Sequence, residues 1–236
     1  MTELPGKAES CWIADAPATH YPVLNGTLHA ETVVVGAGIV GLTVALRLCE
    51  LGRSVIVVDG LRVGRQVTGR STAKITTQHA LIYRHLLDER GMKTAKSYAD
   101  ANSFGASLIR LWVANYGIDC DLESRDAFAY ADRPERRGAI EAEAEAARMV
   151  GLEAKVLNHA PLPFDTAAAL CFPNQVQFNP ARYLIGLATA ISARGGKIFE
   201  RSRAVEIEEA GRWRVVTDEG AVEADNIVIA TNMTVK

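Results

Sequence analysis

Three glycines, Gly36, Gly38 and Gly41, form the segment of this sequence whose spacing most clearly suggests a chemical task. Their G-x-G-x-x-G pattern permits a tight turn, the close approach of a pyrophosphate, and close packing of the helix that follows. Ile39 would open that helix, whose N-terminus offers unpaired N–H groups and a partial positive charge. Glycines at this spacing can also do no more than turn a chain, so the meaning of the pattern depends on its flanks.

The flanks have the composition of two buried strands and a buried helix. Residues 32–35 are an unbroken β-branched run, which is typical of strands covered on both faces. Residues 39–51 are apolar nearly all round, as in a helix packed inside a protein, and Gly52 is suited to ending it. Residues 54–58 are a second strand-like run. Such a strand-helix-strand unit requires its two strands to be parallel.

An acidic residue completes the pattern. Asp59 ends the second strand about 20 residues after the last glycine, where a carboxylate can accept hydrogen bonds from the 2′- and 3′-hydroxyls of a ribose. Gly60 follows it and is a further candidate contact. An acid at this place disfavours a 2′-phosphate, so NADP is not expected here. These residues do not separate NAD from FAD, and an NAD-dependent dehydrogenase stays open.

Composition narrows the class of protein. The 236 residues are 48% apolar and 23% charged, as in globular proteins, and 28 acidic against 26 basic residues give a net charge of −2. This balance provides no sequence-wide cationic field for nucleic acid or anionic lipid. The four cysteines lie far apart without metal-site spacing, so we expect no metal. With neither a leader-like N-terminus nor a membrane-length apolar stretch, the sequence predicts a cytoplasmic protein without a membrane span.

The rest of the chain alternates between helical and extended patterns. Residues 64–77 are predicted to form a loop, Asp132 to cap a helix, and the acidic run 141–145 to be a solvated helix face. Turns are predicted at 210–211 and 219–220. The remaining pattern predicts helices over 83–89, 93–116, 132–150 and 181–193, extended segments over 120–130, 154–157 and 168–172, three antiparallel meander strands from Lys197 onward, and a final buried strand over 226–230.

Several separated motifs, in order, resemble one family. They are Trp12-Ile13-Ala14 with 21–24 in the N-terminal arm, the glycine turn, and the stretches 68–79, 118–121 and 172–180. The chain resembles FAD-dependent oxidoreductases of the D-amino acid oxidase and glycine oxidase superfamily, in the branch with a C-terminal Rieske iron–sulfur domain. This resemblance implies an α/β fold, with a Rossmann-like FAD-binding domain of parallel sheet, helices and antiparallel meander, plus part of an α+β substrate domain.

The resemblance also implies domain limits and cofactor contacts. Residues 1–30 would be an arm, 31–80 with 180–236 the FAD-binding domain, and 81–179 a partial substrate region. The implied FAD contacts are Gly36, Gly38, Ile39 and Gly41 at the pyrophosphate, Asp59 and Gly60 at the ribose, Arg70, Ser71 and Thr72 along the loop toward the flavin, Val205 beside the adenine, and Ala230 with Thr231 near the adenosine end.

Lys74 and His79 are the candidates for a catalytic role, because the corresponding loop of relatives approaches the isoalloxazine ring. A cation beside the flavin would stabilise its reduced, anionic form or activate oxygen. The alternative for each is an orienting hydrogen bond or a surface charge. No other catalytic residue is assigned.

The family's chemistry is oxidation of an amine or amino acid by hydride transfer to flavin N5. A Rieske centre that accepts the electrons would lie outside this sequence, as would the second flavin-binding segment, so the resemblance implies an N-terminal portion. A nucleotide-binding fragment without catalysis, or a split subunit that needs a partner, is the alternative to an enzyme.

Overall fold

The computed structural model describes residues 6–209 and 211–232, which form two compact units. The first unit takes its described residues from Met1–Thr72, Tyr116–Cys120 and Asn179–Lys236, and the second consists of Ala73–Asn115 and Asp121–Phe178. The assignment of FAD binding and substrate binding to separate parts of the chain stays a prediction.

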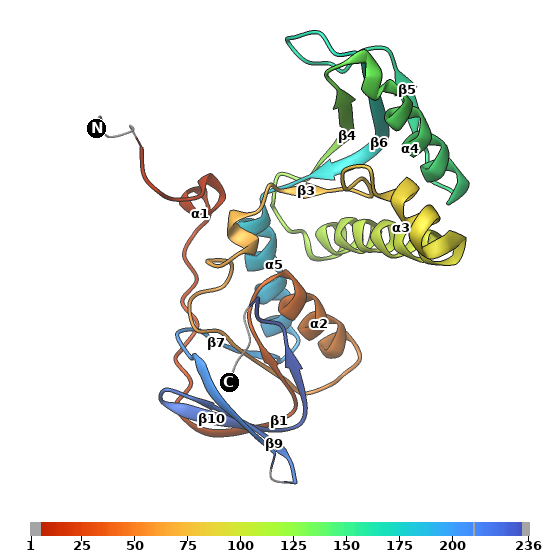
Figure 1. The fold of residues 1–236 in the computed structure, drawn as a ribbon. Helices are drawn as coiled ribbons and strands as arrows, with labels where there is room; N and C mark the ends of the chain where they lie inside the picture. The colour runs from red at the N-terminus through yellow and green to blue at the C-terminus, as the bar shows by residue number, and fades with distance from the viewer. Residues whose placement is uncertain (1–5, 210, 233–236) are drawn as a thin grey trace. The chain divides into compact units, whose positions relative to one another are not determined.

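The first unit is built on a six-stranded sheet with the order β7-β2-β1-β10-β9-β8 (Figure 1). Its strands β7, β2, β1 and β10 are parallel, whereas β10, β9 and β8 are antiparallel. Helices α2 and α5 pack against each other and against the parallel strands. The bounds are β1 Gly26–Val35, α2 Ile39–Glu50, β2 Val55–Val58, α5 Pro180–Ala193, β7 Lys197–Phe199, β8 Ala204–Glu209, β9 Trp213–Thr217 and β10 Gly220–Ile229, with a short helix α1 at Cys11–Asp15 and a 3₁₀ turn η1 at Thr68–Arg70.

The strand-helix-strand unit predicted around the glycines is confirmed. Strands β1 and β2 are parallel from Thr32 to Val35, and all four residues of β2 are buried. Strand β1 starts at Gly26, ahead of the β-branched run, because its polar first half pairs with the first half of β10. Hydrogen bonding to a neighbouring strand thus extends β1 into residues with low strand propensity.

The predicted meander needs two corrections. The segment that starts at Lys197 is two strands, since β7 pairs with β2 in parallel and only β8 belongs to the meander. The third meander strand and the predicted final strand over 226–230 are one strand, β10, which pairs with β9 on one side and β1 on the other. Ala210, in one of the two predicted turns, lies outside the described residues.

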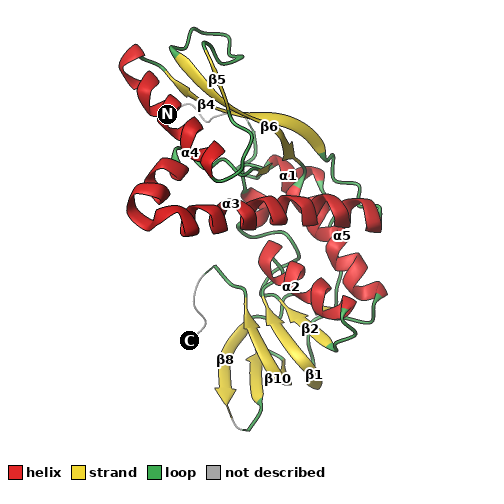
Figure 2. Ribbon diagram, turned by 90° about the vertical axis from the view of Figure 1, so that its right-hand side faces the viewer, coloured by secondary structure: helices red, strands yellow, loops and turns green. Residues whose placement is uncertain are grey.

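The second unit packs two helices on an antiparallel sheet with the order β3-β6-β4, in which β5 also pairs with β6 (Figure 2). Helix α3 is interrupted at Gly91, where φ is 74°, as the two separately predicted helices implied. Tyr83, Ile140 and Phe172 belong to its core. The bounds are β3 Lys74–Ile75, α3 Ile82–Tyr116, β4 Glu123–Ala131, α4 Arg137–Met149 after a 3₁₀ turn η2 at Pro134–Arg136, β5 Lys155–Leu157 and β6 Ala168–Gln177.

The acidic run on α4 is only in part the solvated face that its composition predicts. Glu143 is completely buried, and its carboxylate accepts hydrogen bonds from the backbone N–H groups of Tyr83 at 2.8 Å and Arg84 at 2.7 Å. These donors lie in the first turn of α3, where N–H groups have no intrahelical partner. The cap predicted at Asp132 is wrong, because η2 begins after Arg133 without a side-chain cap.

Replacing Glu143 with alanine is therefore expected to destabilise the second unit by about 2 kcal/mol, since two buried N–H groups lose a charged acceptor. Hydrogen exchange of the amides at the start of α3 measures this loss. Glu145→Ala, at an exposed position on the same helix, is the matched control and should leave exchange unchanged. Equal exchange in the two variants would contradict the capping role.

No helix within the described ranges combines the length and apolar character that a membrane crossing requires. The four cysteines are free thiols, and all except Cys11 are buried.

Candidate functional site

The glycine fingerprint, Gly36, Gly38 and Gly41, forms the turn between β1 and α2. Gly36 has a φ of 110°, and a Cβ there would lie 2.8 Å from the carbonyl oxygen of Ala230. A Cβ on Gly41 would lie 1.9 Å from the carbonyl oxygen of Gly36. These two glycines therefore let the turn, the first turn of α2 and the end of β10 pack together.

Gly38 differs from these two glycines in its backbone conformation and in its packing. It is the N-cap residue of α2, with an extended backbone at φ −86° and ψ −173° that any residue can adopt. The nearest atom to a Cβ there would be the Thr68 hydroxyl oxygen, at an ordinary contact distance of 3.4 Å. Packing among the described residues thus leaves room for a Cβ at Gly38 and does not by itself require glycine there.

Asp59 ends β2 and joins it to the fingerprint. Its Oδ2 accepts a hydrogen bond from the Ala37 N–H at 2.7 Å, and its Oδ1 accepts one from the Leu61 N–H at 2.7 Å. Burial raises the pKa of Asp59 above its usual range, the two N–H donors lower it only in part, and the nearby Glu200 adds to the rise. An ionised carboxylate has about four acceptor positions, and these two hydrogen bonds use two of them.

A second glycine turn lies beside the first, within the loop predicted over residues 64–77, although its glycine spacing was not recognised. Gly64 has a φ of 72°, and a Cβ on Gly69 would lie 1.9 Å from the Gly64 carbonyl oxygen, the same close approach that joins Gly36 and Gly41. Between these glycines, the Thr68 hydroxyl accepts a hydrogen bond from the Ile39 N–H at 3.2 Å. The repeated five-residue glycine spacing is the sequence signal that could have identified this turn.

The other proposed cofactor contacts are placed as follows. Arg70, Ser71 and Thr72 are exposed at the end of this loop, and the Ser71 carbonyl oxygen accepts a hydrogen bond from Trp12 Nε1 at 3.1 Å. Val205 is 46% exposed on β8. A Cβ on Gly60 would lie 3.4 Å from Arg203 Cβ. The Ala230 N–H donates a hydrogen bond to the Val35 carbonyl oxygen at 2.9 Å, and Thr231 is exposed.

The structure thus brings the fingerprint, Ile39, Asp59 and Ala230 together at the ends of β1, β2 and β10. A cavity of about 440 Å³ is lined by Leu61, Arg62, Arg65 and Arg201. The first of these, Leu61, is two residues after Asp59 in the sequence. This basic lining could not be recognised in the sequence, because its members come from two distant segments.

Lys74 and His79, the catalytic candidates, belong to the second unit. Lys74 is exposed on β3, and His79 Nδ1 lies 2.8 Å from the hydroxyl of Tyr98. Burial lowers the pKa of His79, and the charge of Lys74 lowers it further, which favours the neutral imidazole.

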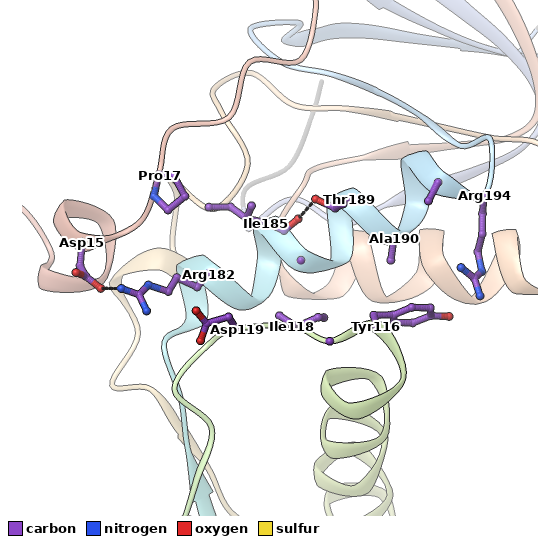
Figure 3. Close-up of a pocket in the computed structure, with 13 residues that line it drawn as sticks. Asp15, Pro17, Tyr116, Ile118, Asp119, Arg182, Ile185, Thr189, Ala190 and Arg194 are labelled. Atoms are coloured by element: carbon purple, nitrogen blue, oxygen red, sulfur yellow. Dashed lines mark hydrogen bonds and ion pairs between the residues drawn. The ribbon is translucent and has the colours of Figure 1, made fainter.

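A larger cavity, of about 610 Å³, lies along α5. At one end the Arg182 guanidinium pairs with the Asp15 carboxylate at 2.7 Å, and at the other the guanidinium of Arg194 lies 4.7 Å from the ring centre of Tyr116 (Figure 3). No residue of this cavity belongs to the predicted FAD contacts.

The sequence matches the DAO family, FAD dependent oxidoreductase, over residues 31–236, and the chain belongs to this family. The family's cofactor is FAD, which decides between the two dinucleotides that the fingerprint left open. The resemblance from which the sequence analysis inferred the family is confirmed.

Two curated relatives and one solved structure illustrate the similarity. YhfW of Bacillus subtilis, named as a Rieske 2Fe-2S iron–sulfur protein, is 31% identical over 209 residues, which are 89% of this chain and 41% of that protein. Gamma-glutamylputrescine oxidoreductase of Escherichia coli is 27% identical over 218 residues, which are 90% of this chain and 51% of that protein. The chain thus spans about half the length of the curated relatives it matches.

The solved structure is L-amino acid deaminase of Proteus myxofaciens, in complex with anthranilate. It has a TM-score of 0.74 and 18% sequence identity, over 92% of this chain and 48% of that one. This likeness confirms the fold class inferred from the sequence, a Rossmann-like α/β fold with a mixed sheet.

Proposed function

We propose that this chain binds the ADP half of FAD at the fingerprint and contributes it to a flavoenzyme that oxidises amines or amino acids. Two features that occur together carry the proposal. Packing does not require glycine at Gly38, and Asp59 supplies a buried carboxylate to the same turn. Gly38 would allow the pyrophosphate to approach the N-terminus of α2, and Asp59 would accept the ribose hydroxyls.

The residues around the turn fit this half of the cofactor. The Ile39 N–H is taken up by Thr68, whose hydroxyl keeps its own hydrogen to donate to a phosphate oxygen. Arg62 and Arg201 line the basic cavity beside Asp59 and would favour the anionic cofactor at its adenosine end. The two acceptor positions left on Asp59 match the two hydroxyls of a ribose.

FAD, when bound, would take up a hydride at flavin N5 from the carbon that bears the substrate nitrogen. The chain's own part is to hold the cofactor: the fingerprint positions the pyrophosphate, and Asp59 fixes the ribose. Lys74 is the residue proposed to place a positive charge near the ring, and neutral His79 is proposed to orient rather than to carry charge.

The substrate class and partner rest on relatives. One relative is named for oxidation of gamma-glutamylputrescine, an amine, which supports a small amine or amino acid as substrate. YhfW is named as a Rieske protein, which supports a Rieske centre as electron acceptor. Anaerobic addition of amines and amino acids to the FAD-loaded flavoenzyme to which this chain contributes tests the substrate class. Loss of visible flavin absorbance is expected with at least one of them, and unchanged absorbance with all would contradict it.

Thermal protection distinguishes the proposed ligand from the alternatives. FAD is expected to raise the unfolding temperature of the chain, because a ligand bound only by the folded state stabilises it. NAD should raise it less, and ADP should give part of the FAD effect. Protection by NAD but not by FAD would contradict the proposal and favour a dehydrogenase.

Asp59→Ala is expected to weaken FAD binding by about 2 kcal/mol, because two ribose hydroxyls lose a charged acceptor. Quenching of flavin fluorescence measures the affinity. Asp218→Ala, exposed at the turn between β9 and β10, is the control and should bind as the wild type does. Unchanged affinity in Asp59→Ala would remove this residue from the site.

The same residue gives a pH dependence. Because burial raises the pKa of Asp59, its carboxylate takes up a proton at a higher pH than an ordinary aspartate does. The protonated form is the weaker acceptor, so FAD affinity falls as the pH is lowered through this raised pKa. Asp59→Asn, which cannot titrate, should bind weakly and show no such fall.

A further inference from the structure

A short segment after β7, residues 200–202, joins the N-terminal arm to the loop that follows Asp59. On the arm side, the Glu200 carboxylate accepts hydrogen bonds from the Thr19 hydroxyl and, at 3.1 Å, from the Tyr21 N–H. The Glu200 N–H donates to the Pro22 carbonyl oxygen at 3.0 Å, and the Ser202 hydroxyl accepts from the Leu24 N–H at 2.8 Å. Four hydrogen bonds thus hold arm residues 19–24.

On the loop side, the same segment makes three hydrogen bonds. The Ser202 N–H donates to the carbonyl oxygen of Asp59 at 2.8 Å, and the Arg201 N–H donates to that of Leu61 at 2.9 Å. The Glu200 carboxylate accepts from the Val63 N–H at 2.9 Å. One carboxylate, that of Glu200, therefore receives donors from both the arm and the loop.

The residues that make these contacts are buried. Glu200 is 0% exposed, Ser202 is 1% exposed, and Leu24 of the arm is 0% exposed within the apolar cluster on the sheet. Arg201, between Glu200 and Ser202, has a φ of 50°, a left-handed conformation that is costly for a residue with a side chain. A fully buried carboxylate with three donors is expensive to disturb, because each donor would be left unpaired.

We propose that Glu200 is a positioning residue for the cofactor site, through which the arm fixes the loop that begins at Asp59. This inference rests on the proposed function, since the loop is the one that would contact FAD. Glu200 itself does not line the basic cavity. It acts by holding Val63 and, through the backbone of its own segment, the carbonyl groups of Asp59 and Leu61. The arm is then part of the cofactor site and not an appendage.

The test compares Glu200→Ala, Glu200→Gln and the exposed control Glu219→Ala in the 236-residue chain. Glu200→Ala is expected to weaken FAD binding about tenfold or more, a change of about 1.4 kcal/mol. Glu200→Gln should lose less FAD affinity, because its amide oxygen can still accept a hydrogen bond from either the arm or the loop. Amide exchange without FAD should rise at both Tyr21 and Val63 in each Glu200 variant, and Glu219→Ala should match the wild type in both measurements.

The outcomes separate this inference from the proposed function. A wild-type chain that takes up no FAD overturns the proposed function. A wild type that binds FAD and a folded Glu200→Gln that binds it equally well, with unchanged exchange at Val63, overturn the positioning role. If Glu200→Ala does not fold, Glu200→Gln still decides, because it preserves the volume of the side chain.

Discussion

Gly38→Ala is expected to abolish measurable FAD binding while the chain remains folded. A methyl group at Gly38 would have only the Thr68 hydroxyl oxygen within contact distance, at 3.4 Å, so the fold accommodates it. The same methyl group would occupy the space into which the pyrophosphate must come. We expect a loss of about 1,000-fold in affinity, or about 4.2 kcal/mol.

Flavin fluorescence quenching measures the affinity, and near-ultraviolet circular dichroism reports whether the fold persists. Gly105→Ala is the matched control, because Gly105 lies on helix α3 with open space around its Cβ position. It should bind FAD normally and be slightly more stable, by roughly 0.5–1 kcal/mol, since alanine favours helix. Normal FAD binding by Gly38→Ala would show that the pyrophosphate does not lie at this turn.

Gly41→Ala is expected to damage the fold itself. Its Cβ would lie 1.9 Å from the backbone carbonyl oxygen of Gly36, so the turn or the first turn of α2 must move. Backbone displacement in a packed element belongs to the small group of severe substitutions, and we expect a loss on the order of 4 kcal/mol. Faster hydrogen exchange of the β1 and β2 amides is the measurement.

Gly138→Ala provides the comparison for Gly41, because its Cβ would meet no atom within 4 Å. The two substitutions should then differ in effect: Gly41→Ala should lower the stability of the fold, whereas Gly38→Ala should lower only the affinity for FAD. Wild-type exchange rates in Gly41→Ala would contradict the packing that we describe between this helix and the turn.

The local elements of the first unit could be predicted from sequence because their signals are local. β-branched runs, an apolar helix and the glycine spacing each arise within a few residues, and they place Asp59 at the end of β2 without knowledge of the rest. Strand β10 could not be predicted in the same way. Its polar middle, around Asp225, lies in one continuous strand because β10 pairs along its length with β1, which comes from a distant segment, as well as with the preceding strand β9.

The same reason explains the structural and site residues that were missed. Glu143 is in an acidic run that composition assigns to solvent, yet it is buried because the first turn of α3 needs an acceptor. Nothing in the sequence distinguishes Thr68 and Glu200 from other polar residues. Thr68 accepts a hydrogen bond from the distant Ile39, and Glu200 accepts hydrogen bonds from the distant Thr19 and Val63. Such pairings are properties of the tertiary fold.

Binding of FAD at the glycine fingerprint is tested most directly by mixing the wild-type chain and Gly38→Ala separately with FAD and recording the visible spectrum of each after gel filtration. The wild type should carry FAD that excess NAD does not displace, and Gly38→Ala should leave the column without flavin absorbance. A wild-type chain without flavin absorbance, or a variant that carries as much FAD as the wild type, would contradict binding at the fingerprint.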